Sequence, residues 1–147
     1  MTDRTAADDA FKNRCANAAR TLAPLSGCFI TRISFAAFAE DDSLEIILRK
    51  GPASPDVVIE LSSLHYVSVS KPPEISGCFI DAISLIHLPK TPRPWPGDAA
   101  SRVRRFDGLP ELAWLRVLDP ADVDVMASIV TVYTAASDDE TSTDTTR

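Results

Sequence analysis

The chain has 147 residues, of which 45% are hydrophobic and 24% are charged, with a net charge of −6. This length is typical of one globular domain, and the composition excludes collagen-like or wholly disordered chains. The acidic balance disfavours nucleic acid and suits a basic protein partner, and the absence of a long apolar run predicts no membrane association. No signal peptide is recognisable at the start, so we expect a cytoplasmic location.

The first element predicted is a helix over residues 5–23. Apolar side chains recur on one helical face: Phe11, Cys15, Ala18 and Leu22. Asp8 and Asp9 lie in the first turn, where the helix dipole favours negative charge, and Pro24 ends the helix. The narrow, alanine-rich stripe predicts light packing against a sheet.

From residue 27 the apolar period changes from that of a helix to the alternation of a strand. Four strands separated by short turns are expected between residues 27 and 70: one from 27, then 44–49, 57–61 and 64–69. Consecutive strands with short connections predict an antiparallel meander. With the helix in front, the fold class is α+β and mainly β, with a meander or sandwich-like sheet.

A ten-residue segment occurs twice, fifty positions apart. Residues 26–35 and 76–85 are identical at seven of ten positions, and both begin with Ser-Gly-Cys-Phe-Ile. We interpret the copies as equivalent strands, related by a pseudo-two-fold axis or lying side by side. Gly27 and Gly77 permit unusual backbone angles at strand entry. If the strands are neighbours in register, Cys28 and Cys78 could pair, although reduced, buried thiols are the default in a cytosolic protein.

Beyond residue 88 the pattern is less regular. Four prolines make residues 89–97 a loop, and residues 98–106 are expected to form a short helix with Asp98 as its N-cap. Residues 112–118 predict a strand. Residues 121–134 favour a strand, because β-branched side chains and alternation dominate, while a helical turn at 120–127 is the alternative.

The domain organisation follows from these elements. Residues 1–136 are expected to form one β-rich domain. Residues 137–147 contain no large apolar side chain and four acidic ones, so we expect a disordered acidic tail.

Catalytic and cofactor chemistry has no signature in the sequence. No nucleophile elbow, phosphate loop or dinucleotide motif occurs. His65 and His87 are the only histidines, and Asp81 with His87 would supply only two ligands of a metal site, so a structural role is expected for each. We therefore predict a protein that is not an enzyme and holds no cofactor or metal.

The candidate site is a reversal of charge within an acidic chain. The residues that we expect to bind a partner are Arg93, Trp95, Arg102, Arg104 and Arg105. Arginine and aromatic residues dominate interface hot spots, and proline rigidity lowers the entropy cost of binding. The alternatives are that Trp95 covers the core, that the arginines pair with acidic segments of the chain, or that the cluster binds phosphate or RNA.

The strand rhythm of residues 44–48 and 57–69 resembles that of small β-rich immunity proteins of bacterial polymorphic toxin systems and of related domains of unknown function. The excess of Arg over Lys also indicates a bacterial genome. The resemblance implies a non-enzymatic protein-binding domain that inhibits one partner. The alternatives are a structural or self-assembling module, which would be a homo-oligomer, and an uncharacterised enzyme or small-ligand carrier.

Overall fold

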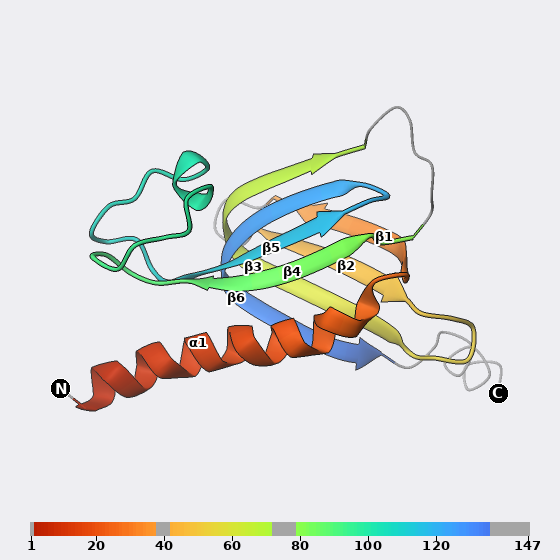
Figure 1. Ribbon diagram of the computed structural model, residues 1–147, viewed down its shortest axis with the longest axis horizontal. Coiled ribbons are helices and arrows are strands. Elements are labelled where there is room, and N and C mark those ends of the chain that lie inside the picture. The colour runs from red at the N-terminus through yellow and green to blue at the C-terminus, as the bar shows by residue number, and fades with distance from the viewer. Residues whose placement is uncertain (1, 38–41, 72–78, 136–147) are drawn as a thin grey trace.

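The computed structural model describes residues 2–37, 42–71 and 79–135, with side chains from Ala10 onwards. One long helix lies beside a strongly bent antiparallel sheet, and a long loop projects from one end of the sheet (Figure 1). The predicted class, α+β and mainly β, is confirmed. The strands form a single sheet, and the expected acidic tail at 137–147 lies outside the described residues.

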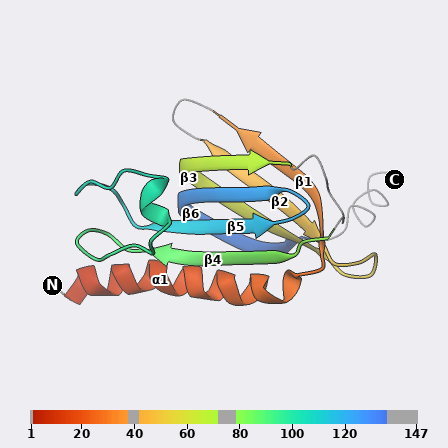
Figure 2. The ribbon, with the colours of Figure 1, turned by 45° about the horizontal axis from the view of Figure 1, so that its top comes forward.

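Helix α1 spans Thr2–Leu22, so it begins earlier than the sequence pattern indicates, and it continues into the 3-10 turn η1, Ala23–Leu25. Pro24 lies inside this turn, which ends the regular helix as expected. The helix runs along strand β4 in both views of the ribbon (Figure 1, Figure 2). No helix in the described residues is both long and apolar enough to cross a membrane.

The sheet has six strands in the order β1-β2-β3-β6-β5-β4, and all neighbouring pairs are antiparallel. Their bounds are β1 Phe29–Ala36, β2 Ser43–Arg49, β3 Asp56–Ser70, β4 Ala82–Leu88, β5 Leu112–Leu118 and β6 Asp122–Ala135. The first three strands form the predicted meander. Strand β6 then pairs with β3, so the second half of the chain completes the sheet.

Strand β3 corrects one prediction, because the two strands expected at 57–61 and 64–69 are one strand of 15 residues. The polar pair Ser62-Ser63 indicated a turn. Instead, Ser63 takes a positive φ of 53° and the register against β6 shifts between Leu64 and Tyr66. A bulge of this kind bends a strand without ending it, since β6 continues to supply hydrogen bonds on both sides of the bend.

Two further predictions concern the C-terminal half. Residues 98–106 do not form the expected helix, because only the 3-10 turn η2, Ala99–Ser101, is present, and Asp98 makes no side-chain capping bond. Residues 122–135 form strand β6, which confirms strand over helix. Here β-branched residues and tertiary pairing outweigh the helix-start signal at Asp119-Pro120.

The core lies on both faces of the sheet. The inner cluster lies between α1 and the sheet, and the strands contribute alternate residues to it. Its helical members are Cys15, Ala18 and Leu22, and its central strand members include Ile46, Ile59, Leu61, Leu115, Val117 and Val125. The outer cluster lies on the opposite face, under the β4–β5 loop, and consists of Leu88, Ala99, Leu109, Leu112, Trp114 and Met126. Strand β5 is therefore buried on both faces over Leu112–Leu115.

The described parts of the two repeated segments touch near their starts. However, β1 and β4 are not neighbours in the sheet, so the copies are not the side-by-side strands that were one interpretation of the repeat. Phe29 and Phe79 form an isolated antiparallel bridge, and main-chain bonds of 2.8 Å join Gly27 N to Ile80 O and Ile80 N to Cys28 O. This contact brings the start of β1 to the chain just before β4, at opposite edges of the sheet. Gly27 has the positive φ expected of it, +91°, whereas Gly77 and Cys78 lie outside the described residues. Cys28 is a free, buried cysteine, which is the default state expected from the sequence rather than a disulfide with Cys78.

Candidate functional site

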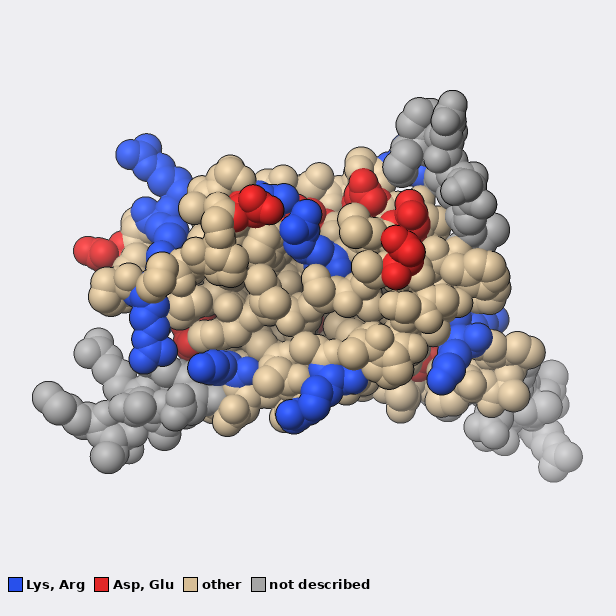
Figure 3. Space-filling view, viewed as in Figure 1, with Lys and Arg blue, Asp and Glu red and all other residues tan. Residues whose placement is uncertain are grey.

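The connection between β4 and β5, residues 89–111, contains all five predicted partner-binding residues, and we call it the arginine–tryptophan loop. It projects from the end of the sheet and packs on the outer cluster. Figure 3 shows Lys and Arg side chains gathered at the left end of the molecule, where this loop lies, and along the lower edge, where α1 lies. Loops longer than about 12–15 residues are uncommon in compact domains and are usually functional.

Arg102 fixes the loop to the sheet through Asp124 of β6. Arg102 Nε donates to Asp124 Oδ2 at 2.6 Å, and Trp114 Nε1 donates to Asp124 Oδ1 at 2.6 Å. The Arg102 guanidinium also lies 5.1 Å from the centroid of the Trp114 ring. The pKa of Arg102 is raised, first because Asp124 accepts its hydrogen bond. Asp124 therefore joins the loop, β5 and β6.

Trp95 and Arg105 form a second anchor at the base of the loop. Trp95 Nε1 donates to the carbonyl oxygen of Pro89 at 2.7 Å, and its ring packs against the outer cluster. The Arg105 guanidinium lies 4.6 Å from the Trp95 ring centroid, and its Nη2 donates to the same Pro89 oxygen at 3.3 Å. Trp95 is half-buried, so it covers part of the core, as one of the sequence alternatives expected.

Arg93 and Arg104 have a different setting from the anchors. Both are exposed, and neither makes an ion pair with a described residue. Phe106, which follows Arg105, is 58% exposed. Of the five predicted residues, Arg93 and Arg104 thus present charge to solvent, and the other three hold the loop in place.

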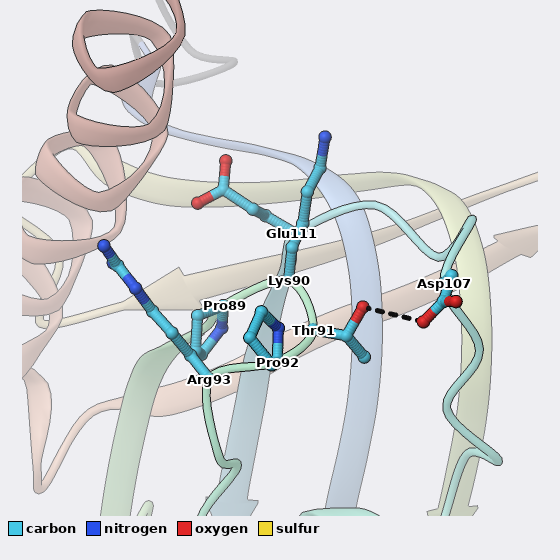
Figure 4. Close-up of a pocket in the computed structure, with 7 residues that line it drawn as sticks. All are labelled: Pro89, Lys90, Thr91, Pro92, Arg93, Asp107 and Glu111. Carbon is cyan, nitrogen blue, oxygen red and sulfur yellow. Dashed lines mark hydrogen bonds between the residues drawn. The ribbon is translucent and has the colours of Figure 1, made fainter.

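A cavity of about 420 Å³ opens at the base of the loop, beside α1. Its lining is Pro89, Lys90, Thr91, Pro92, Arg93, Asp107 and Glu111. Figure 4 shows Arg93 extending toward the helix, the Glu111 carboxylate in the same part of the cavity, and Asp107 on the other side of Thr91. Thr91 Oγ1 donates weakly to Asp107 Oδ1, at 3.4 Å. The cavity thus carries two cations and two carboxylates.

Glu111 also belongs to a half-buried group under α1. His87 Nε2 and Glu111 Oε1 are 2.6 Å apart, and each side chain is only 13% exposed. The Phe11 ring of α1 lies 5.7 Å from the His87 ring. His87 is therefore hydrogen-bonded within the fold, which agrees with the structural role expected for it.

Burial is the main influence on the ionisation of the two cysteine thiols in the described residues. Burial first, and then the negative charge of Glu111, together raise the pKa of Cys15 to about 11. Burial also raises the pKa of Cys28, while Lys50 acts in the opposite direction. A neutral thiol is a poor nucleophile, so the proximity of Cys15 to Glu111 does not make it an activated cysteine.

The sequence did not reveal the roles of Asp124 and Glu111. Alternation at 122–125 placed Asp124 on the outer face of a strand, but its partner Arg102 is 22 residues away in a loop. Within residues 10–37, 42–71 and 79–135 no group of three His, Cys, Asp or Glu side chains is placed to hold a metal ion. Comparison with protein-family models and with curated proteins finds no match to this chain.

Proposed function

We propose that the chain is a non-enzymatic protein-binding domain and that the arginine–tryptophan loop is its recognition element. The proposal rests on the observation that some residues of the loop hold it in place while others are exposed to solvent. Trp95, Arg102 and Arg105 are fixed by the sheet and by Pro89, while Arg93 and Arg104 stay exposed. A loop held in one conformation loses little entropy on binding, so its exposed groups can contribute fully to affinity.

The exposed groups also have the chemistry of an interface. Arginine and aromatic side chains are enriched among residues that dominate binding energy. Phe106 supplies the aromatic surface, and Arg93 and Arg104 supply cations without carboxylate partners among the described residues. The immunity-type inhibitor implied by the family resemblance is one form that this function would take.

The test is affinity purification from the native host after nuclease treatment, with mass spectrometry of what co-purifies. Three baits are compared: the wild type, a loop variant (Arg93→Glu, Arg104→Glu, Phe106→Ala) and a control variant (Arg32→Glu, Lys50→Glu, Phe35→Ala). The control removes the same charges and an equally exposed ring, since Phe35 is 56% exposed. We expect one stoichiometric protein with the wild type and the control, and its loss from the loop variant. A partner that the loop variant retains would refute this interface.

The cavity beside α1 supports a second candidate function, the binding of a small zwitterionic ligand. Its volume of about 420 Å³ lies within the range of ligand pockets. Lys90 and Arg93 match a carboxylate, and Asp107 and Glu111 match an ammonium group. Calorimetric titration with free amino acids and dipeptides tests this function. Binding that Arg93→Ala and Asp107→Ala both weaken would support it, and no detectable heat with any of them would remove it.

A further inference from the structure

Arg116 of β5 lies opposite a carboxylate that it does not bind. In the antiparallel register, Arg116 faces Asp124 of β6 on the outer face of the sheet. Directly opposed residues of opposite charge ordinarily pair across strands. Here both carboxylate oxygens of Asp124 already accept bonds, one from Arg102 and one from Trp114, each at 2.6 Å. Among the described residues, Arg116 has no carboxylate within ion-pair distance.

The Arg116 guanidinium is nevertheless held in place. It lies 5.1 Å from the centroid of the Trp114 ring, which the Arg102 guanidinium also contacts at 5.1 Å. Trp114 is only 2% exposed, so the ring that both cations contact is held in place by the fold. Stacking of this kind orients a guanidinium and leaves its donors directed to other partners. Arg116 is therefore a cation held on Trp114 that forms no ion pair with a described residue, adjacent to the arginine–tryptophan loop.

The surroundings of Arg116 form a notch of about 130 Å³ on the outer face of β4 and β5, lined also by Ala82, Ser84 and Leu118. Ser84 is the cross-strand neighbour of Arg116, and Leu118 is the neighbour of Ala82. Leu118 is 45% exposed and Ile86, further along β4, is 38% exposed. A hydroxyl, a guanidinium and an apolar rim thus lie together on the same face as the loop.

We propose that this notch receives a carboxylate side chain from an acidic segment of the protein partner. Arg116 would hold the carboxylate, and neighbouring apolar side chains of the segment would cover Leu118 and Ile86. This inference rests on the proposed function, because it names the chemistry of the partner that the adjacent loop binds. Charge complementarity selects the occupant, since the notch and the loop both present unpaired cations. The partner surface is therefore acidic, whereas the acidity of the whole chain had suggested a basic partner.

The net charge does not oppose an acidic partner. Half of the charge of −6 belongs to residues 136–147, which carry four carboxylates and one arginine. At short range the local sign of a surface decides its complement, because ions screen exposed charges beyond about 8–10 Å. The arginine–tryptophan loop, residues 89–111, carries five cationic side chains against three carboxylates, so its own charge balance is positive.

The experiment uses fluorescein-labelled, amidated octapeptides of alternating Glu and Leu, with Gln/Leu and Lys/Leu peptides as matched probes, in anisotropy titrations of the full chain. We expect the Glu/Leu peptide to bind at least about tenfold more tightly than the others. Arg116→Ala should weaken it about tenfold, and Arg116→Lys should restore binding only in part, because lysine lacks the planar fork. Arg32→Ala, at an exposed cation of β1, should leave binding unchanged.

Two results would overturn the inference: no binding of the Glu/Leu peptide up to about 1 mM, or equal binding by wild type and Arg116→Ala. Thermal melts of each variant ensure that a loss of binding is not a loss of fold. Binding of the native partner to the variants distinguishes a failure of this inference from a failure of the proposed function. If the loop variant loses that partner while Arg116→Ala retains it, the loop is the interface and the notch is not part of it.

Discussion

Phe29 and Phe79 face each other across the antiparallel bridge that joins the two copies of the repeated segment, and their ring centroids are 4.7 Å apart. The rings lie on the outer side, where Phe29 is 37% and Phe79 is 52% exposed. The neighbouring Cys28 and Ile80 are buried in the inner cluster. Apolar side chains of the repeat thus join the start of β1 to the chain before β4, with the phenylalanine rings on the outer side and Cys28 and Ile80 on the inner side.

The first prediction concerns this ring pair. Aromatic pairs contribute about 0.5–1.5 kcal/mol beyond the area they bury. A double-mutant cycle with Phe29→Ala and Phe79→Ala, followed by urea denaturation, should therefore give a coupling energy of about 1 kcal/mol. The same cycle with Phe29→Ala and Phe106→Ala is the control, because Phe106 belongs to the loop at the end of the sheet. If the effects of Phe29→Ala and Phe79→Ala on the free energy of unfolding are additive, the two rings do not stabilise the bridge through their mutual contact.

The second prediction concerns Asp124. Asp124→Asn removes one acceptor from a side chain that joins Arg102 and Trp114, and it leaves a guanidinium without its counter-charge. We expect the free energy of unfolding to fall by about 1–3 kcal/mol, as for other partly buried, charge-assisted hydrogen bonds. Asp122→Asn, two residues earlier on the same strand and exposed, should change it by less than about 0.5 kcal/mol. Equal effects in urea denaturation would contradict the anchoring role.

The third prediction concerns the pH dependence of Cys15. Its pKa is about 11 in the folded chain against an ordinary 9.0, so the folded state holds the proton more tightly. The unfolded thiol ionises first, and the contribution of this group to stability is therefore complete below pH 9 and is lost between pH 9 and pH 11. In urea titrations at several pH values, Cys15→Ala should remove this part of the decline.

Thiol labelling gives an independent measurement of the same group. In a chain with Cys28→Ser and Cys78→Ser, Cys15 should react with a disulfide reagent at pH 8 at least about 100-fold more slowly than in urea-unfolded chain, because both the thiolate fraction and access are reduced. Rapid labelling of the folded chain would show that Cys15 is accessible and ionisable.

The fourth prediction separates the anchors of the loop from its contact residues. Trp95→Ala should lower the free energy of unfolding by about 2 kcal/mol, less than for a fully buried Trp, because the ring is half-buried. Arg104→Glu should change it by less than about 0.5 kcal/mol. Thermal and urea unfolding of both variants measure the difference. If Trp95→Ala proves neutral, the ring does not support the loop and would be free to contact a partner directly.

Local patterns were sufficient to predict most elements of this fold. The helical stripe of α1, the alternation in β2 and the apolar run of β5 depend only on neighbouring residues, and these elements form where the sequence predicts them, apart from the earlier start of α1 at Thr2. The sequence predicts two strands in place of β3 because the polar pair Ser62-Ser63 resembles a turn. In the structure, the pairing with β6 continues on both sides of the bulge, so the strand is not interrupted. Residues 98–106 were misread for a related reason, since their conformation follows the anchoring of Arg102 and the packing of Ala99 rather than helix propensity.

The sequence predicts which segment contains the candidate site, but it does not predict what each residue of that segment does. Composition located the arginines and the tryptophan, because their charge differs from that of the rest of the chain. Arg102 is anchored by Asp124, whereas Arg105 is anchored by Trp95 and the Pro89 carbonyl oxygen. Asp124 accepts hydrogen bonds from Arg102 and Trp114 and forms no ion pair with Arg116, although Arg116 lies opposite it, and this arrangement is visible only when the strands are in register.

Leu88 and Leu112 are cross-strand partners at the base of the arginine–tryptophan loop, so the chain leaves the sheet and returns to it at a single point. The pairing of β4 with β5 therefore requires that the two ends of the insertion meet there. Closure entropy grows slowly with length, by about 0.6 kcal/mol for each doubling of a flexible loop. A grafted insertion of another length would keep the strand register, provided that it also covers the outer cluster as Ala99 and Leu109 do here.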